Sequence, residues 1–257
     1  MNSNRIAIVT GAAQGIGRAI ALRLAADGLD IVLNDIASQR ALLDAVKEEV
    51  IAAGRRAVVF CADISIDEEV KNMVAFTVET FGALDVMVAN AGICKARASL
   101  LDVNPAEWDQ TFAVNVRGTF LCYQHAAQQM ILQGRGGRII GAASGAGKQG
   151  YALLPDYSAS KFAVRGLTQA AALEFGKHGI TVNTYAPGAV VTPMTSQFPI
   201  LAGMSPEAFF ADQAKLAATG VNPTPQDIAS VVSFLAAKES TFITGQSISA
   251  DGGRYFD

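Results

Sequence analysis

A regular alternation of short apolar runs with longer helix-like stretches is the feature that most restricts how this chain folds. Strand-like runs fall at 6–9, 30–35, 57–61, 84–89, 137–142, 181–185 and 246–250. Helix-like stretches fall at 15–26, 39–53, 66–81, 108–133, 157–178 and 227–237. The run at 6–9 is apolar at every position, which is typical of a parallel strand buried on both faces. The pattern therefore predicts an α/β fold, a doubly wound, seven-stranded parallel sheet with helices on both faces.

The length of 257 residues, with no linker-like stretch, favours a single domain over 1–257. The segment at 193–225 breaks the alternation, since it contains five prolines and only short amphipathic pieces. An insertion late in a doubly wound sheet lies beside the carboxyl ends of the strands. We expect a substrate lid there, and the alternative is a long surface connection.

Composition excludes several classes of function. The net charge is −3 with no basic block, which argues against a nucleic-acid partner, and no apolar run reaches the roughly 18 residues of a membrane span. Cys61, Cys94 and Cys122 are too scattered for a disulfide framework or a metal site, and neither His125 nor His178 has a partner at metal-ligand spacing. We expect a cytoplasmic protein with reduced thiols, no metal and no membrane association.

A glycine-rich loop follows the first strand-like run. Gly11, Gly15 and Gly17 permit a tight turn, and Gln14 and Ile16 lie between them. Backbone amides and the positive end of the following helix would then face a pyrophosphate. The spacing differs from the commoner G-x-G-x-x-G fingerprint, and glycines also mark ordinary turns, but the position after the first strand favours a dinucleotide site.

An acid ends the second strand-like run, 18 residues after Gly17. There, Asp35 would accept hydrogen bonds from both hydroxyls of an adenosine ribose and repel a 2′-phosphate, which predicts NAD(H) rather than NADP(H). The alternatives are a solvated acid at a strand end and a phosphate contact from Arg40.

Tyr157 and Lys161 are four residues apart in a helix-like stretch and share one face. Tyrosine has a reference pKa of about 10, and a neighbouring ammonium and a nicotinamide cation would both lower it. Tyr157 would then exchange a proton with an alcohol or carbonyl oxygen. Ser144, just past a strand, would hydrogen-bond that oxygen.

Several motifs in register give a more specific prediction. These are Thr10-Gly11-x3-Gly15-x-Gly17, Asn90-Ala91-Gly92, Asn115, Ser144, Tyr157-x3-Lys161, Pro187-Gly188 and Asp251-Gly252-Gly253. In order and spacing the chain resembles the short-chain dehydrogenase/reductase family over essentially its whole length. Ala89 and Ala143 stand where that family often has Asn and Ser, and neither change removes a group from the proposed chemistry.

The resemblance implies a Rossmann-type domain, an oxidoreductase acting on CH–OH groups, and roles for named residues. Lys161 would bind the nicotinamide ribose and lower the pKa of Tyr157, and Asn115 would hold a water that links Lys161 to solvent. The other residues implied to contact or surround NAD(H) are Asp63 and Ile64 at the adenine, Asn90, Ala91 and Gly92 at the adenosine side, Pro187 and Gly188, and Val190 and Thr192 at the carboxamide.

Within the family, the stretches 157–169, 181–188 and 191–194 resemble the acetoin (diacetyl) reductase and 2,3-butanediol dehydrogenase branch. We therefore expect reduction of a small α-diketone or α-hydroxyketone. The residues expected to face the substrate are Gly145, Gln149, Tyr151, Ala189 and the lid around Met194 to Phe198. Gln149 and Tyr151 would bind a second oxygen, or else are loop residues satisfied by backbone. A carboxylated or phosphorylated substrate is an alternative if Lys95, Arg97 or Lys148 borders the cleft.

Rival interpretations within the family are a sugar or polyol substrate, or a 3-oxoacyl thioester, although thioester reductases usually prefer NADPH. A rival of another class is an NAD-binding redox sensor without turnover. The resemblance also implies a homotetramer, with the helices at 108–133 and 157–178 in one interface and the last strand near another.

Overall fold

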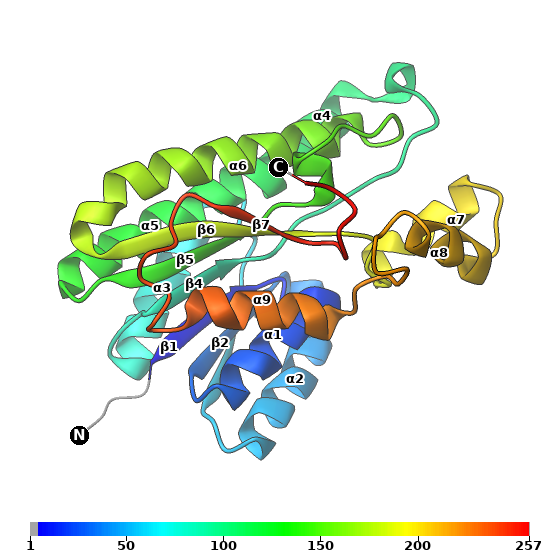
Figure 1. The fold of residues 1–257 in the computed structure, drawn as a ribbon. Helices are drawn as coiled ribbons and strands as arrows, with labels where there is room; N and C mark the ends of the chain where they lie inside the picture. Colours follow the sequence, from blue (N-terminus) through cyan, green and yellow to red (C-terminus); the bar gives the residue numbers. More distant parts are fainter. Residues whose placement is uncertain (1–4, 257) are drawn as a thin grey trace.

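The computed structural model describes residues 5–256, in which seven strands form one parallel sheet. The strands are β1 (Ile6–Thr10), β2 (Asp30–Asp35), β3 (Ala57–Cys61), β4 (Val86–Ala89), β5 (Gly137–Ala142), β6 (Ile180–Pro187) and β7 (Ser247–Ala250). They lie in the order β3-β2-β1-β4-β5-β6-β7 (Figure 1). The order reverses between β1 and β4, where doubly wound sheets bind their ligands. The predicted fold class is confirmed.

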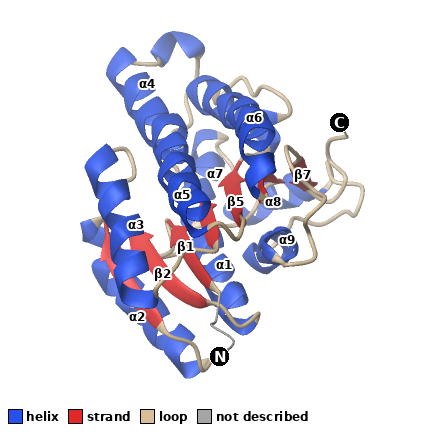
Figure 2. Ribbon diagram, turned by 90° about the vertical axis from the view of Figure 1, so that its left-hand side faces the viewer, coloured by secondary structure: helices blue, strands red, loops and turns tan. Residues whose placement is uncertain are grey.

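Helices cover both faces of this sheet (Figures 1 and 2). The helices α1 (Gly15–Ala26), α2 (Arg40–Ala52) and α9 (Pro225–Ala236) cover one face, and α3 (Asp67–Phe81), α5 (Thr119–Gln133) and α6 (Pro155–Phe175) cover the other. Within β1, Ala7 and Val9 belong to one apolar core, and Ile8 belongs to the opposite one. Both cores are apolar, and for this reason the strand sequence shows no alternation.

The long helix predicted at 108–133 is present, but it begins earlier and contains a π-helical segment. A first helix, α4 (Pro105–Phe112), begins earlier because the Asn104 side chain accepts a hydrogen bond from the amide of Ala106 at 2.8 Å. A π-helical segment, Ala113–Gly118, then leads into α5. Proline at the first position likewise starts α6 two residues before the predicted Tyr157.

The segment after β6 forms a 3-10 turn (Pro193–Ser196), α7 (Gln197–Leu201) and α8 (Pro206–Ala214). These short helices lie beyond the carboxyl ends of the strands, to one side of the helical layers (Figure 1). No helix among residues 5–256 combines the length and the apolar character that a membrane crossing requires.

We expect Asp30→Asn to lower the free energy of unfolding by about 2–3 kcal/mol. Asp30 is fully buried at the start of β2 and accepts hydrogen bonds from Arg55 Nη2 at 2.7 Å and Arg56 Nη2 at 2.6 Å. Burial raises its pKa, but the bonds from Arg56 and Arg55 outweigh burial and hold the pKa of Asp30 below its usual value.

A carboxylate with a lowered pKa stabilises the fold above its unfolded pKa of about 3.9, and this stability is lost as the pH falls through the folded value. The difference between wild type and Asp30→Asn in urea unfolding should therefore shrink below pH 4 or so. Asp44→Asn removes an exposed ion pair with Arg40 and is the control, expected to change little. An equal effect of both variants would contradict this account.

Candidate active site

A cavity of about 660 Å³ opens at the carboxyl ends of the central strands. Most residues predicted to bind a dinucleotide or to carry the chemistry line it. They are Gly11, Gln14, Gly15, Ile16, Gly17, Asp35, Asp63, Ile64, Asn90, Ala91, Gly92, Ser144, Tyr157, Lys161, Pro187, Gly188, Val190 and Thr192. The sequence motifs, spread over most of the chain, therefore meet in one place.

Most of the residues predicted to face substrate line the same cavity: Gly145, Tyr151, Ala189, Met194, Thr195 and Phe198. Gln149 is exposed and does not belong to the lining, so the structure does not support its predicted contact with substrate. Its amide continues the turn that follows Ser144 by bonding the carbonyl of Gly145, and this turn directs the side chain to solvent.

The glycine loop is built so closely that side chains would not fit. A Cβ atom at Gly17 would lie 2.0 Å from the carbonyl oxygen of Gly11, and Gly11 itself has a φ of +64°. The residue before α1, Gln14, makes no side-chain hydrogen bond to the first amides of that helix. These amides and the positive end of the helix therefore face the cavity, and they fit the pyrophosphate of a dinucleotide.

Asp35 lies at the end of β2 on the adenosine side of this loop. One carboxylate oxygen accepts a hydrogen bond from the amide of Ala13 at 3.3 Å, and the other accepts one from the amide of Ile36 at 2.9 Å. Burial raises the pKa of Asp35. Each oxygen keeps acceptor capacity for a ribose hydroxyl. Arg40, the alternative phosphate contact, instead donates to Asp44 at 2.8 Å.

Thr10 and Asn90 connect the loop to the sheet. The hydroxyl oxygen of Thr10 accepts hydrogen bonds from the amides of Asn90 and Ala91, both at 3.0 Å. The Asn90 side chain donates to the carbonyl of Thr10 at 2.8 Å and accepts from the hydroxyl of Tyr185 at 2.7 Å. The contact with Tyr185 was not predicted, because in sequence that residue is one more apolar position of a buried strand.

Tyr157 and Lys161 extend from the first turns of α6 toward the same part of the cavity. The Lys161 Nζ atom donates to the carbonyl of Ala142 at 2.7 Å and lies 5.4 Å from the centre of the Tyr157 ring. Ser144 follows β5, where its Oγ accepts a hydrogen bond from the amide of Ala146 at 3.1 Å. That bond leaves the Ser144 hydroxyl proton available for another acceptor in the cavity.

Burial dominates the electrostatics of this pair. It raises the pKa of Tyr157, against a smaller lowering by the Ser144 hydrogen bond, and it lowers the pKa of Lys161 to about 8. The predicted lowering of the Tyr157 pKa by Lys161 is not seen among the protein's own groups, because desolvation disfavours the charged form of each side chain.

Asn115 is fully buried in the π-helical segment and does not line the cavity. Its side chain accepts a hydrogen bond from the amide of Ile93 at 2.8 Å, and donates to the Ile93 carbonyl at 2.9 Å and to Ser160 Oγ at 3.1 Å. It holds the strand-end loop against α6 in this way. The predicted water held by Asn115 remains a prediction.

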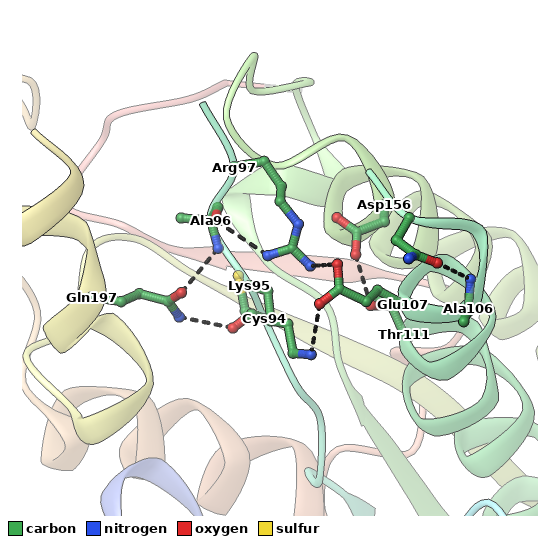
Figure 3. A network of polar contacts seen from close by, with 10 residues as sticks. Cys94, Lys95, Ala96, Arg97, Ala106, Glu107, Thr111, Asp156 and Gln197 are labelled. Carbon is green, nitrogen blue, oxygen red and sulfur yellow. Dashed lines mark hydrogen bonds and ion pairs between the residues drawn. The ribbon is translucent and has the colours of Figure 1, made fainter. Parts of the chain in front are cut away.

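The segment at 193–225 is attached to the loop after β4 through Gln197 of α7 (Figure 3). The Gln197 side chain donates to the carbonyl of Cys94 at 2.8 Å and accepts from the amide of Ala96 at 2.9 Å. Lys95 and Arg97 in this loop pair with Glu107 at 3.2 Å and 2.9 Å. These two cations are therefore engaged outside the cavity.

The third cation considered from sequence, Lys148, donates to the carbonyl of Ser247 at 2.7 Å and is also absent from the lining. The cavity wall also includes residues that the sequence did not single out. From the segment at 193–225, the loop before α6 and the C-terminal turn these are Leu153, Leu154, Leu201, Phe209, Phe210, Gln213 and Arg254, and the loop after β4 adds Ile93 and Cys94. Within residues 5–256, no group of three or more His, Cys, Asp or Glu side chains is arranged to hold a metal ion.

A dinucleotide cradle beside a Ser–Tyr–Lys set defines a nicotinamide-dependent oxidoreductase, and comparisons with known proteins identify which kind. The sequence profile described as short chain dehydrogenase matches residues 5–199. Over 257 residues the chain is 52% identical to a short-chain dehydrogenase/reductase of Armillaria gallica, covering 100% of this chain and 98% of that one.

Over 259 residues it is 43% identical to a diacetyl reductase, (S)-acetoin forming, of Staphylococcus epidermidis, covering 97% of this chain and 98% of the relative. The crystal structure of carveol dehydrogenase from Mycobacterium avium in complex with NAD superposes with a TM-score of 0.93 at 31% identity, and 98% of each chain is covered. The chain belongs to the short-chain dehydrogenase/reductase family and is an NAD-dependent enzyme, as the sequence predicted.

We expect Gly17→Ala to weaken NADH binding by at least about 100-fold, because the added Cβ would displace the backbone of the loop at Gly11. Fluorescence titration with NADH measures the dissociation constant. Gly166→Ala, in α6, adds a Cβ with no atom within 4 Å and is the control, expected to bind NADH normally. Unchanged binding in Gly17→Ala would show that the loop does not carry the pyrophosphate.

Proposed function

We propose that this enzyme interconverts a ketone and a secondary alcohol, and that its substrate is a small α-diketone or α-hydroxyketone such as diacetyl or acetoin. The observation that carries the proposal is the placement of Ser144, Tyr157 and Lys161 along one cavity with the glycine loop and Asp35. The substrate oxygen is then within reach of two hydroxyl donors.

When bound, NADH supplies the hydride in the direction of ketone reduction. The Ser144 hydroxyl donates a hydrogen bond to the carbonyl oxygen and orients it. Tyr157 gives its proton to the same oxygen as the alcohol forms, and its raised pKa keeps that proton in place until then. Lys161, one turn along α6, is buried with a lowered pKa, so a neighbouring negative charge would favour its charged form.

Two observations support a compact diketone or hydroxyketone. The similarity to the diacetyl reductase of Staphylococcus epidermidis extends over 97% of this chain. Tyr151 places a second hydroxyl in the cavity beside Gly145, next to Ser144. Asp35 argues against the NADPH-dependent thioester alternative, and the apolar lid argues against a sugar.

A second candidate is a ketone with a larger apolar skeleton, such as a cyclic ketone. The lid contributes Met194, Phe198, Leu201, Phe209 and Phe210 to the cavity wall, more apolar surface than a four-carbon substrate would cover. The similar fold of a protein named carveol dehydrogenase agrees with this candidate.

We further propose that the segment at 193–225 acts as a substrate lid, held in place by Gln197, and that four copies assemble in the cytoplasm. The outer side of α4 and α5 carries a hollow lined by Asp109, Phe112, Ala113, Val116, Arg117 and Phe120. Exposed apolar side chains such as Phe120, Phe162 and Leu173 lie on α5 and α6 and would be covered in an assembly. Light scattering of the purified protein should give the mass of a tetramer.

We expect Tyr157→Phe to reduce ketone turnover about a thousandfold while NADH binding is retained, because only the proton donor is removed. The loss of NADH absorbance with diacetyl and with cyclohexane-1,2-dione measures the rate. Tyr123→Phe is the control: this buried phenol bonds Thr168 at 2.9 Å, outside the cavity, and its loss should leave turnover unchanged.

Retained activity in Tyr157→Phe would overturn the assignment of the proton donor. A wild-type protein that binds NADH but reduces none of a broad set of ketones would instead favour the non-catalytic redox sensor.

A further inference from the structure

The turn after β7 brings two polar side chains to the substrate end of the cavity. Asp251 is 4% exposed, and one of its carboxylate oxygens accepts hydrogen bonds from the amides of Gly253 at 3.0 Å and Arg254 at 3.1 Å. The other oxygen accepts one from the amide of Tyr255 at 3.2 Å. Gly252 and Gly253 have φ of +70° and +78°, which this turn requires. The turn thus fixes the backbone positions of Arg254 and Tyr255, from which their side chains extend.

Arg254, Tyr255 and Tyr151 form a chain of hydrogen bonds. The Nε–H of Arg254 donates to the hydroxyl oxygen of Tyr255 at 2.8 Å, and that hydroxyl is hydrogen-bonded to the hydroxyl of Tyr151. The Arg254 guanidinium also donates to Gln213 Oε1 at 2.9 Å, which connects it to the last turn of α8. Its charge lies 5.3 Å and 5.8 Å from the centres of the Tyr255 and Tyr151 rings.

The guanidinium only donates, so the hydroxyl oxygen of Tyr255 accepts from Arg254. Either phenol can donate in the bond between Tyr255 and Tyr151. When a substrate oxygen accepts the Tyr151 proton, Tyr255 becomes the donor to Tyr151, and each bond then polarises the next. Burial raises the pKa of Tyr151, so this phenol holds a proton that it can donate at neutral pH.

The Tyr151 end of this chain of hydrogen bonds lies beside the residues proposed to act on the substrate carbonyl. Tyr151 and Arg254 line the cavity. A Cβ atom at Gly145 would lie 3.5 Å from the Tyr151 hydroxyl oxygen and 3.1 Å from the Tyr255 ring, and Gly145 directly follows Ser144. The hydroxyl of Tyr151 is therefore placed near the carbonyl that Ser144 and Tyr157 address.

We propose that Arg254 and Tyr255 are positioning residues that orient the Tyr151 hydroxyl as a donor to a second substrate oxygen, close to the carbonyl that is reduced. This inference rests on the proposed function and narrows the substrate class to ketones with such an oxygen, whether the skeleton is linear or cyclic. A simple ketone leaves the Tyr151 donor without a partner, and this is how the enzyme would discriminate against it.

The test uses two matched substrate pairs, diacetyl with butan-2-one and cyclohexane-1,2-dione with cyclohexanone. The ratio of kcat/KM within each pair is measured for wild type, Tyr151→Phe, Tyr255→Phe and the double variant. Tyr255→Phe keeps the ring and removes only the hydroxyl, and thermal unfolding checks that it folds. We expect the ratio to fall about tenfold in each single variant, mainly through the KM of the diketone.

Because Tyr255 acts through Tyr151, the double variant should lose no more than Tyr151→Phe alone. An unchanged ratio in Tyr255→Phe, an equal loss on both members of a pair, or additive losses in the double variant would each overturn the inference while leaving the proposed function intact. If wild type reduces none of the four ketones with NADH, the proposed function fails, and this inference fails with it.

Discussion

The hydrogen bonds around Thr10 and Asn90 are the interaction on which the rest of the site depends. At the point where the strand order reverses, the chain must leave room for a ligand and still keep adjacent strand ends together. The Thr10 hydroxyl and the Asn90 amide do this by joining β1 to β4, and Tyr185 extends the connection to β6. A Cβ atom at Gly11 would lie 2.9 Å from Asn90 Nδ2, so the glycine loop rests directly on this connection.

The parts of the structure that sequence predicts well are those set by local patterns. Ile8 and Val9 face opposite cores, and the uninterrupted apolar run predicts a strand covered on both faces. The glycine loop and Asp35 are recognisable because they follow strands, and parallel strands bring their carboxyl ends to one edge. The position of each motif along the chain therefore predicts its position in space.

Contacts between distant segments were not predictable in the same way. The sequence gives Gln149 and Tyr151 the same prediction, contact with a second substrate oxygen. Only Tyr151 lines the cavity, because the turn after Ser144 directs Gln149 to solvent. Lys95 and Arg97 lie in a loop near the site, but Glu107 of α4 engages both. Arg254 reaches the cavity only through the fold of the Asp251 turn. The sign of the Tyr157 pKa shift also depends on burial, which no spacing reveals.

The π-helical segment at Ala113–Gly118 limits which insertions and deletions the long helix from α4 to α5 can accept. A π turn holds one residue more than an α-helical turn of the same length, and such turns occur frequently at functional sites. Removing one residue here would restore α-helical geometry and rotate everything beyond it by about 100°. Asn115 would then lose its hydrogen bonds to Ile93, or α5 would turn a different face to the sheet. The extra residue thus sets the rotation of α5 relative to Asn115, and an insertion or deletion at this turn would change both the contacts of Asn115 and the outer surface of α5.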